Sequence, residues 1–157
     1  MKPEQSYSAN WLSNLEIPLA NKFYRNHGFR GKARRNELCA VVRDAQQLIV
    51  ACGYIREYDS FNLLAGIAVA ESNQHQGLAR LLVKRMAERF DRQTYTFPYS
   101  YLMRFYQSLG FNLVNPDQQA IPQADLYESY RLYESYRKQG RRILLMHYQP
   151  DSYLASN

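Results

Sequence analysis

Short blocks of apolar residues, each bounded by polar or turn-forming residues, define most of the elements expected in this chain. Residues 38–43 and 48–56 are rich in β-branched and small apolar residues, and a turn-like segment at 44–47 separates them. This pattern predicts an antiparallel pair of strands. A third strand is predicted at 62–69, where an unbroken apolar run favours burial on both faces. Gly66 within this run indicates a bulge or a close approach of other atoms to the backbone.

Three further blocks repeat their apolar residues at helical spacing. They predict helices at 15–27, 77–90 and 101–109, and Gly28 and Gly110 are suited to end the first and the third. The helix at 77–90 is amphipathic, which predicts that one side of it is buried. Its expected buried stripe consists of Leu78, Leu81, Leu82, Met86 and Phe90.

The remaining blocks are shorter. Strands are predicted at 94–97, 111–114 and 142–148, a weaker strand pattern covers 7–12, and a loop is predicted at 116–122. Strands and helices therefore alternate, and the order predicts a mixed α/β fold with a mostly antiparallel sheet flanked by helices.

The segment 125–139 predicts one more helix, with an unusual content of tyrosine. The pentapeptide YESYR occurs in it twice, and the tyrosines cover about half of the helix circumference at about 100° per residue. We expect these rings to pack against the sheet; they are Tyr127, Tyr130, Tyr133 and Tyr136. Stacking of RNA bases on the rings beside Arg141 and Arg142 is a lower-ranked interpretation, because Glu128 and Glu134 offset the local positive charge.

Composition restricts the class of protein. About 46% of the residues are hydrophobic and 22% are charged, which is typical of a globular protein, and 157 residues fit a single domain over 1–157. No apolar run approaches the roughly 20 residues of a membrane span, and the chain does not begin with a signal-peptide pattern. We therefore expect a cytoplasmic protein with no membrane partner. The net charge of +6 favours anionic partners, including nucleic acid, acidic lipid and phosphorylated cofactors.

The two cysteines are expected to be buried free thiols. In the predicted hairpin, Cys39 and Cys52 fall opposite each other across the ladder. A disulfide would suit that geometry, but the cytosol is reducing. Two cysteines and three scattered histidines give no zinc-ligand spacing, so no metal site is predicted.

The strongest candidate for chemistry is the turn between the strand at 62–69 and the helix at 77–90. A short polar segment ends at Gly77, which opens the helix. The first amides of a helix have no partners within it and carry the positive end of the helix dipole, so they bind phosphate groups. Gly77 also tolerates a positive φ and lets a ligand approach the backbone closely.

Two motifs resemble those of the GNAT acyltransferase superfamily. Gln74-x-x-Gly77-x-Ala79 is similar to the Gln/Arg-x-x-Gly-x-Gly/Ala signature with which these enzymes hold the pyrophosphate of acetyl-CoA. The segment 105–111, FYQSLGF, is similar to the Tyr-x-x-x-Gly-Phe element on the helix after their fifth strand. The motifs occur in the expected order, and the resemblance covers about 15–114 together with the predicted last strand.

The resemblance implies a GNAT-like acyl-CoA N-acyltransferase fold and gives roles to particular residues. Backbone amides from Gln74 to Ala79 would hold the pyrophosphate, with added charge from Arg80 and Lys84. The exposed edge of the strand at 62–69 would pair with the pantetheine arm and polarise the thioester carbonyl. Tyr106 would face the leaving sulfur. The cofactor-binding residues implied in this way are Ile67, Ala68, Val69, Gln74, His75, Gln76, Gly77, Leu78, Ala79 and Arg80.

The chain departs from the family pattern at three positions. Tyr99 and Leu102 stand where members often have Asn and Ala, and Leu63 stands where a subset has a catalytic Glu. Without that Glu, a weakly basic amine could lose its proton to water, whereas a strongly basic amine would need a nearby base. The candidates for such a base are Glu57, Asp59, Glu71 and His27.

The acceptor site implied by the resemblance lies where the first helix and the following loop cover the splayed strands. The connection 28–36 is short and basic. An acceptor with an anionic part, such as an amino acid carboxylate, would suit its cations, which are Arg30, Lys32, Arg34 and Arg35.

These observations predict an acetyl-CoA-dependent N-acetyltransferase. It would move an acetyl group to an amine of a small molecule or peptide by direct attack in a ternary complex, because neither Cys39 nor Cys52 has a recognisable His partner. The alternative is a catalytically silent acyl-CoA-binding sensor or partner protein, which the missing Asn and Glu favour. A homodimer is left open, and nucleic acid ranks below an amine substrate as a partner.

Overall fold

The computed structural model describes residues 6–115 and 124–150, and the chain forms two compact units. The first unit comprises the chain up to Arg56 together with Leu64–Phe90, and the second comprises Glu57–Leu63 together with the chain from Asp91 onward. Seven strands follow the order β1-β2-β3-β4-β5-β7-β6. The mixed α/β class predicted from the sequence is therefore confirmed.

The strands of the first unit follow the apolar blocks of the sequence closely. β1 pairs antiparallel with β2, and β2 pairs antiparallel with β3. β2 and β4 have the predicted bounds, because polar or turn residues flank each apolar run. The four strands are β1 (Ser8–Trp11), β2 (Leu38–Arg43), β3 (Ile49–Glu57) and β4 (Asn62–Val69).

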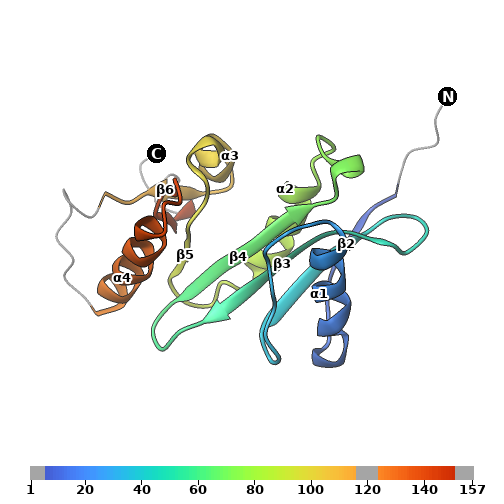
Figure 1. Cartoon of the computed structure of the whole chain (residues 1–157), viewed down its shortest axis with the longest axis horizontal. Helices are drawn as coiled ribbons and strands as arrows, with labels where there is room; N and C mark the ends of the chain where they lie inside the picture. The colour runs from blue at the N-terminus through green and yellow to red at the C-terminus, as the bar shows by residue number, and fades with distance from the viewer. Residues whose placement is uncertain (1–5, 116–123, 151–157) are drawn as a thin grey trace. The chain divides into compact units, whose positions relative to one another are not determined.

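Two helices cover the opposite faces of these strands. Figure 1 shows α1 (Ile17–Asn26) in front of β2 and β3, and α2 (Leu78–Met86) behind them. The 3-10 turn η1 (Asn14–Glu16) precedes α1, and η3 (Ala87–Arg89) follows α2. The core beneath α1 contains Ile17, Ala20, Phe23, Tyr24, Cys39, Val41, Cys52 and Tyr54.

Local sequence explains where α1 begins and ends. Ser13 and Glu16 form a capping box at η1, and a proline occupies the first turn of α1, where its missing N–H costs nothing. At the other end Gly28 has a φ of 72°, and the Phe29 N–H donates to the Tyr24 carbonyl at 2.9 Å. Gly28 therefore ends the helix, as predicted.

The buried stripe of α2 differs from the predicted one. Leu78, Leu82 and Met86 are buried as expected, but Leu81 is 37% exposed and Val83 is buried in its place. At about 100° per residue, Val83 and Leu81 both lie about 100° from the centre of the stripe formed by Leu78, Leu82 and Met86, on opposite sides of it, so the spacing alone does not decide which of the two is buried. The helix also ends earlier than predicted, at Met86, and continues as the 3-10 turn η3.

The predicted pairing of the two cysteines is wrong by two positions. Cys39 lies opposite Tyr54, and Cys52 lies opposite Val41. The turn is set by Asp44, whose carboxylate accepts the amides of Gln46 and Leu48, and a register shift follows Val42. Both thiols are nevertheless buried and free, as predicted, with their Sγ atoms 3.8 Å apart on one face of the hairpin.

The second half of β4 is less buried than its apolar sequence predicts. Asn62–Leu64 are buried, whereas residues 65–67 are half-buried. The next strand in the order, β5 (Thr94–Thr96), has three residues, whereas β4 has eight. Within the second unit, the Asn62 N–H donates to the Gln93 carbonyl at 2.7 Å.

The second unit joins three short strands with two helices. β7 (Met146–Tyr148) pairs antiparallel with both β5 and β6 (Phe111–Leu113). It is shorter than the predicted strand at 142–148, and Ile143 forms only an isolated bridge with Tyr99. The helices are α3 (Met103–Ser108), preceded by the 3-10 turn η4 (Ser100–Leu102), and α4 (Ala124–Lys138). The predicted loop at 116–122 lies outside the described residues.

The tyrosines of α4 pack as predicted only in part. Tyr133 is buried, and the ring of Phe97 lies 6.3 Å from that of Tyr133 and 5.6 Å from that of Tyr136. Tyr127 is 55% exposed, since it lies in the first turns of the helix, away from these contacts. Arg131, Arg137 and Arg141 lie over Tyr127, Tyr133 and Tyr136 respectively, so the chain itself occupies a face of each of these rings.

Candidate functional site

The turn after β4 has the backbone conformation that the Gly77 motif predicts. Residues Glu71–Asn73 form the 3-10 turn η2, Gln74 is extended, and His75 and Gly77 have φ values of 66° and 77°. Gly77 stands at the N-cap of α2 in the left-handed region, which glycine adopts without steric cost. Residues 74–77 are all exposed.

The N-cap residue of α2, Gly77, has no side chain with which to cap the helix. The Leu81 N–H donates to the Gly77 carbonyl at 3.1 Å. The amides of Leu78 and Ala79, which precede it, are those that a helix start leaves without an internal acceptor. The N-terminus of α2 therefore presents backbone N–H donors, with positive partial charge, to an exposed loop.

The polar side chains of the loop are tied to other groups. The Gln74 amide side chain donates to the Val69 carbonyl at 3.3 Å, and the Tyr7 hydroxyl donates to Gln76 Oε1 at 2.5 Å. Asn73 Nδ2 reaches the same Tyr7 hydroxyl at 3.5 Å. The contribution of Tyr7 is not readable from the motif, because it comes from a residue 69 positions earlier in the chain.

One predicted donor is already engaged. The Gln74 N–H donates to the Glu71 carbonyl at 3.3 Å, which closes η2. The other amides predicted to bind the diphosphate are those from His75 to Ala79.

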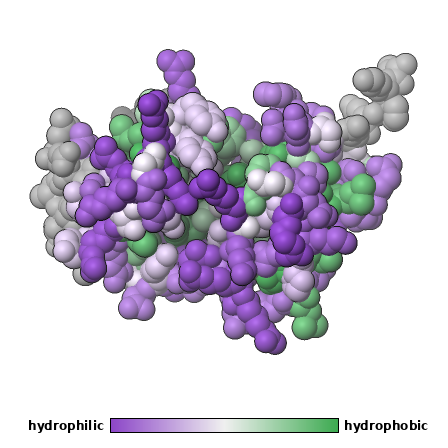
Figure 2. All heavy atoms as spheres, in the orientation of Figure 1, coloured by the Kyte–Doolittle hydropathy of each residue, from purple (hydrophilic) through white to green (hydrophobic). Residues whose placement is uncertain are grey.

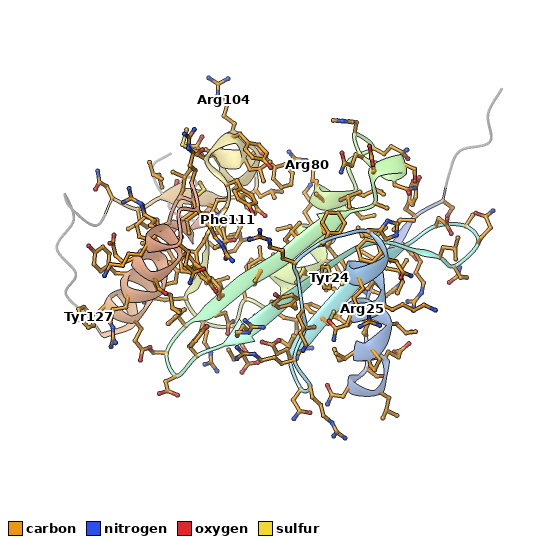
Figure 3. The ribbon with its side chains drawn as sticks, in the orientation of Figure 1. Tyr24, Arg25, Arg80, Arg104, Phe111 and Tyr127 are labelled. Atoms are coloured by element: carbon orange, nitrogen blue, oxygen red, sulfur yellow. The ribbon has the colours of Figure 1, made fainter. Side chains whose placement is uncertain are left out.

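The two cations on α2 differ in environment, since Arg80 is half-buried and Lys84 is exposed. Figure 3 labels Arg80 on the first turn of α2.

The predicted pantetheine-binding residues lie at the end of β4. Ala68 is buried, and Ile67 and Val69 are half-buried. Ile67 packs over Gly53 of β3, where a Cβ would collide with Ile67 Cδ1 and lie 3.1 Å from Met86 Sδ. The glycine at position 53 thus makes room for the side chain of Ile67 on the α2 side of the sheet.

Gly66 interrupts β4 with a φ of 68°, and the close approach predicted there is confirmed. The Tyr24 hydroxyl donates to the Gly66 carbonyl at 2.6 Å, and a Cβ at this position would lie 2.7 Å from that hydroxyl oxygen and overlap the ring of Tyr54. Tyr24 is 1% exposed. Tyr24 falls in the helix predicted at 15–27, and no local signal reveals its bond to a strand 42 residues away.

Tyr106 lies in the second unit, on α3. It is buried, and its ring contacts Phe105 and Phe111 edge-on, at 5.1 and 5.6 Å between centroids. Gly110, with a φ of 103°, ends α3 and places Phe111 at the start of β6, beside Tyr106. This explains the spacing of the Tyr-x-x-x-Gly-Phe element. Burial alone raises the pKa of the Tyr106 phenol well above its ordinary value, so the phenol is neutral at neutral pH.

The positions that depart from the family pattern have ordinary packing roles. Leu63 is buried, and Tyr99 is 46% exposed and stacks on Tyr101 at 5.8 Å. Glu57, Asp59, Glu71 and His27, the candidate bases, all lie at the surface. Glu57 lies 3.8 Å from Arg92, and the ring of His27 lies 4.6 Å from that of Phe23.

Residues 6–115 and 124–150 contain no group of three or more His, Cys, Asp or Glu side chains that could hold a metal ion. No helix in these ranges is long and apolar enough to cross a membrane.

Sequence comparison identifies the class of protein that this fold and loop define. The family model of the acetyltransferase (GNAT) domain matches residues 35–113, about half of the chain. The chain therefore belongs to the GNAT acetyltransferase family. No curated protein matches it significantly in sequence.

Solved structures agree on the fold. The ribosomal-protein-S18-alanine N-acetyltransferase from Escherichia coli is 17% identical, with a TM-score of 0.62 over 90% of this chain and 92% of that chain. An IAA acetyltransferase from Bacillus cereus is 17% identical, with a TM-score of 0.54 over 70% and 79%. N-acetylglutamate synthase from Neisseria gonorrhoeae, complexed with coenzyme A and N-acetyl-glutamate, is 12% identical with a TM-score of 0.61. That match covers 90% of this chain but 34% of the synthase, so the chain spans about a third of its length.

Proposed function

We propose that this protein is an acetyl-CoA-dependent N-acetyltransferase that acetylates an amine by direct attack in a ternary complex. Membership of the GNAT family supports acyl transfer from coenzyme A in general. The acetyl group, the amine acceptor and the residues that carry the reaction belong to the proposal. So does a cytoplasmic location, where acetyl-CoA is available and thiols stay reduced.

The observation that carries the proposal is the uncapped start of α2 at Gly77. Its N-cap residue, Gly77, makes no side-chain capping bond, and the side chains of Gln74 and Gln76 are bonded elsewhere. Such an end favours a diphosphate through direct N–H donation and through the helix dipole. Arg80 and Lys84 add positive charge on the same helix.

The thioester would lie along β4, beside Ile67, Ala68 and Val69. A backbone N–H there would donate to the carbonyl oxygen as negative charge develops on it, which is the arrangement that stabilises a tetrahedral intermediate. The amine nitrogen attacks the carbonyl carbon, the C–S bond breaks, and coenzyme A leaves as a thiolate. The products are the N-acetylated amine and free coenzyme A.

Tyr106 would assist the departure of the thiolate by donating a hydrogen bond to sulfur. An ordinary phenol has a pKa near ~10 and a thiol near ~8.5, so complete proton transfer is already uphill by about 2 kcal/mol. Burial raises the pKa of Tyr106 further and makes it a weaker acid. Hydrogen-bond donation, with solvent as the final proton source, is therefore the favoured role.

The acceptor must be neutral to attack. A lysine-like amine with a pKa near ~10.4 is about 99.9% protonated at neutral pH, which costs roughly 4 kcal/mol, whereas an α-amine with a pKa near ~8 costs about 1 kcal/mol. Because Leu63 replaces the catalytic Glu, an α-amine that can lose its proton to water suits this chain better than a lysine side chain.

A covalent acetyl-cysteine intermediate does not suit the two thiols. Cys39 and Cys52 are both fully buried, so neither sulfur is exposed to a thioester. Contact with the Cys52 thiol together with burial raises the pKa of Cys39, whereas the hydrogen bond with Cys39 lowers the pKa of Cys52. A buried neutral thiol is a poor nucleophile.

Direct attack in a ternary complex predicts that the lines of double-reciprocal plots for acetyl-CoA and the amine intersect. Parallel lines would contradict the ternary complex.

The function is tested by detecting free coenzyme A during incubation with acetyl-CoA and a panel of amines. We expect release that depends on the amine and an acetylated product of the corresponding mass. The alternative function, a silent acyl-CoA-binding sensor, is favoured by Leu63 and Tyr99 in place of the family's Glu and Asn. Binding of acetyl-CoA without turnover of any amine in a broad panel would support the sensor and contradict the enzyme.

A further inference from the structure

The excess positive charge of the chain lies in one segment, residues 17–36. This segment contains six of the 20 Lys and Arg residues and none of the 14 Asp and Glu residues. The rest of the chain therefore carries 14 cations and 14 carboxylates. The formal net charge of +6 equals the charge of this segment, which we call the basic segment.

All six cations of the basic segment are exposed. They come from the second half of α1 and from the loop that follows it: Lys22, Arg25, Arg30, Lys32, Arg34 and Arg35. None forms an ion pair with a carboxylate of residues 6–115 or 124–150. In Figure 2 the surface over α1 and this loop is mainly hydrophilic.

The carboxylates on either side of the basic segment are already engaged. Glu37 accepts from Arg56 Nε at 2.5 Å and from the Arg34 backbone N–H at 2.5 Å. Glu16 accepts from the Ser13 N–H at 2.9 Å and lies 3.9 Å from Arg43. Neither flanking acid is directed at a cation side chain of the segment, so its positive field is not cancelled locally.

The loop part of the segment is held in a defined shape. The Asn21 side chain donates to the Ala33 carbonyl at 2.9 Å and accepts the Ala33 N–H at 2.8 Å. Arg56 donates to the Lys32 carbonyl at 3.2 Å, and Gly31 lies against the ring of Tyr24 so closely that a Cβ would collide with it. An ordered loop loses less conformational entropy on binding than a mobile one.

Tyr24 connects the basic segment to the strand that would carry the thioester. Its ring lies under Gly31, and its hydroxyl donates to the Gly66 carbonyl, next to Ile67. Figure 3 labels Tyr24 and its neighbour Arg25 on α1; the first is buried and the second is exposed. The cations therefore lie within the same unit as the proposed cofactor site, and Tyr24 of the same segment bonds to β4.

We propose that the acceptor amine belongs to an acidic polypeptide, whose carboxylates bind the basic segment while its amine approaches β4. This inference rests on the proposed function and names the substrate class for it. A single small carboxylate engages one or two cations, whereas six exposed cations spread over a helix and a loop match several carboxylates along an extended chain. The attraction is electrostatic and exposed, so salt weakens it.

The test compares three fluorescent peptides of equal length with an N-terminal alanine followed by glutamates, serines or lysines. In anisotropy titrations of the whole protein at about 50 mM salt, we expect the glutamate peptide to bind at least about tenfold more tightly than the serine peptide. The lysine peptide should bind most weakly. At about 500 mM salt the differences should fall to about threefold or less. Equal binding of the three peptides would overturn the inference.

Matched charge reversals locate the binding surface. The double variant Arg34→Glu/Arg35→Glu should reduce the preference for the glutamate peptide at least about tenfold. The control Arg137→Glu/Lys138→Glu changes the net charge equally on α4 and should leave the preference unchanged. If both double variants lost the preference for the glutamate peptide equally, net charge rather than the basic segment would govern binding. That result would contradict the inference.

Two further probes separate this inference from other partners and from the proposed function. A single-stranded RNA oligomer or vesicles containing phosphatidylserine that bind the basic segment more tightly than the glutamate peptide would overturn the acidic polypeptide as its partner. Acetyl transfer to the glutamate peptide with a kcat/KM above that of the serine peptide would support it. Failure of the protein to bind acetyl-CoA would contradict the proposed function instead, and the anisotropy titrations would still decide whether the segment prefers acidic chains.

Discussion

At the scale of single residues, the hydroxyl of Tyr24 fixes the backbone of β4 at the point where that strand departs from regular geometry. It donates to the Gly66 carbonyl at 2.6 Å from a nearly fully buried position. We predict that Tyr24→Phe lowers the free energy of unfolding by about 1–3 kcal/mol, because the carbonyl loses its donor. We also predict a lower kcat with acetyl-CoA affinity within about twofold, since the bond supports the strand that would hold the thioester.

Chemical denaturation and steady-state kinetics measure both effects of Tyr24→Phe. Tyr133→Phe is the control, because Tyr133 is also a buried tyrosine and lies on α4 in the second unit. A Tyr24→Phe protein as stable and as active as the parent would show that the hydroxyl does not position β4.

Tyr106 is the residue at which the leaving group would be stabilised. We predict that Tyr106→Phe lowers kcat about 10- to 100-fold, because the thiolate loses a hydrogen-bond donor, and leaves the Kd of acetyl-CoA within about twofold. Quenched-flow or steady-state assays measure kcat, and calorimetry measures Kd. Tyr133→Phe again serves as the control. An unchanged kcat would remove Tyr106 from the mechanism.

The pH dependence provides a second test of Tyr106. The phenol acts in its protonated form, so its contribution is present below its pKa and lost above it. Because burial raises the pKa of Tyr106, we predict that log kcat/KM rises with pH as the amine deprotonates and shows no descending limb below about pH 10. A descending limb near pH 8 in the parent that is absent in Tyr106→Phe would contradict a buried neutral donor.

At the scale of elements, sequence pattern predicted what depends on neighbouring residues and failed where distant contacts decide. Strand β4 and the Gly77 turn were readable because a run of apolar residues, a left-handed glycine and a helix start are local features. The register of β2 on β3 depends on how Asp44 closes the turn and on the shift after Val42, and it was misjudged by two positions. The bond between Tyr24 and Gly66 joins elements 42 residues apart and left no signal in the pattern.

Strand β7 should make the stability of the fold depend on pH. His147 stacks on Tyr95 at 4.4 Å with 15° between the rings, and burial lowers the pKa of His147. The folded state therefore binds a proton less readily than the unfolded state, so this contribution to stability is present above about pH 6.5, the ordinary value, and is lost as the pH falls below it. We predict a decrease in the free energy of unfolding between about pH 7.5 and 5.5.

The variant His147→Phe keeps an aromatic ring on Tyr95 but cannot titrate. Urea unfolding of this variant should depend less on pH in that range than unfolding of the parent. His75→Gln, at an exposed histidine, is the control and should keep the pH dependence of the parent. The same slope in the parent and in His147→Phe would show that another group is responsible.

At the scale of the whole molecule, the proposed cofactor binding depends on backbone geometry, and the proposed acceptor binding depends on charge. The first unit holds the Gly77 turn, the end of β4 and the basic segment, and the second unit holds Tyr106. A single domain over 1–157 remains a prediction. The roles given to the site residues of both units also remain predictions. The family and the mixed α/β fold are established, whereas the acidic acceptor is a proposal that rests on the distribution of charge, which the family motifs do not contain.

Calorimetric titration of acetyl-CoA into the protein and into Gly77→Ala tests the central claim most directly. Gly77 and Gly140 have φ values of 77° and 80°, and a Cβ at either position would meet no atom within 4 Å, so Gly140→Ala carries the same backbone strain away from the loop. We predict that the parent and Gly140→Ala bind acetyl-CoA alike, and that Gly77→Ala, which places a methyl group where the diphosphate would lie, binds at least about tenfold more weakly. Equal affinity in all three proteins, or no binding by the folded parent at millimolar ligand, would contradict a diphosphate site at the start of α2.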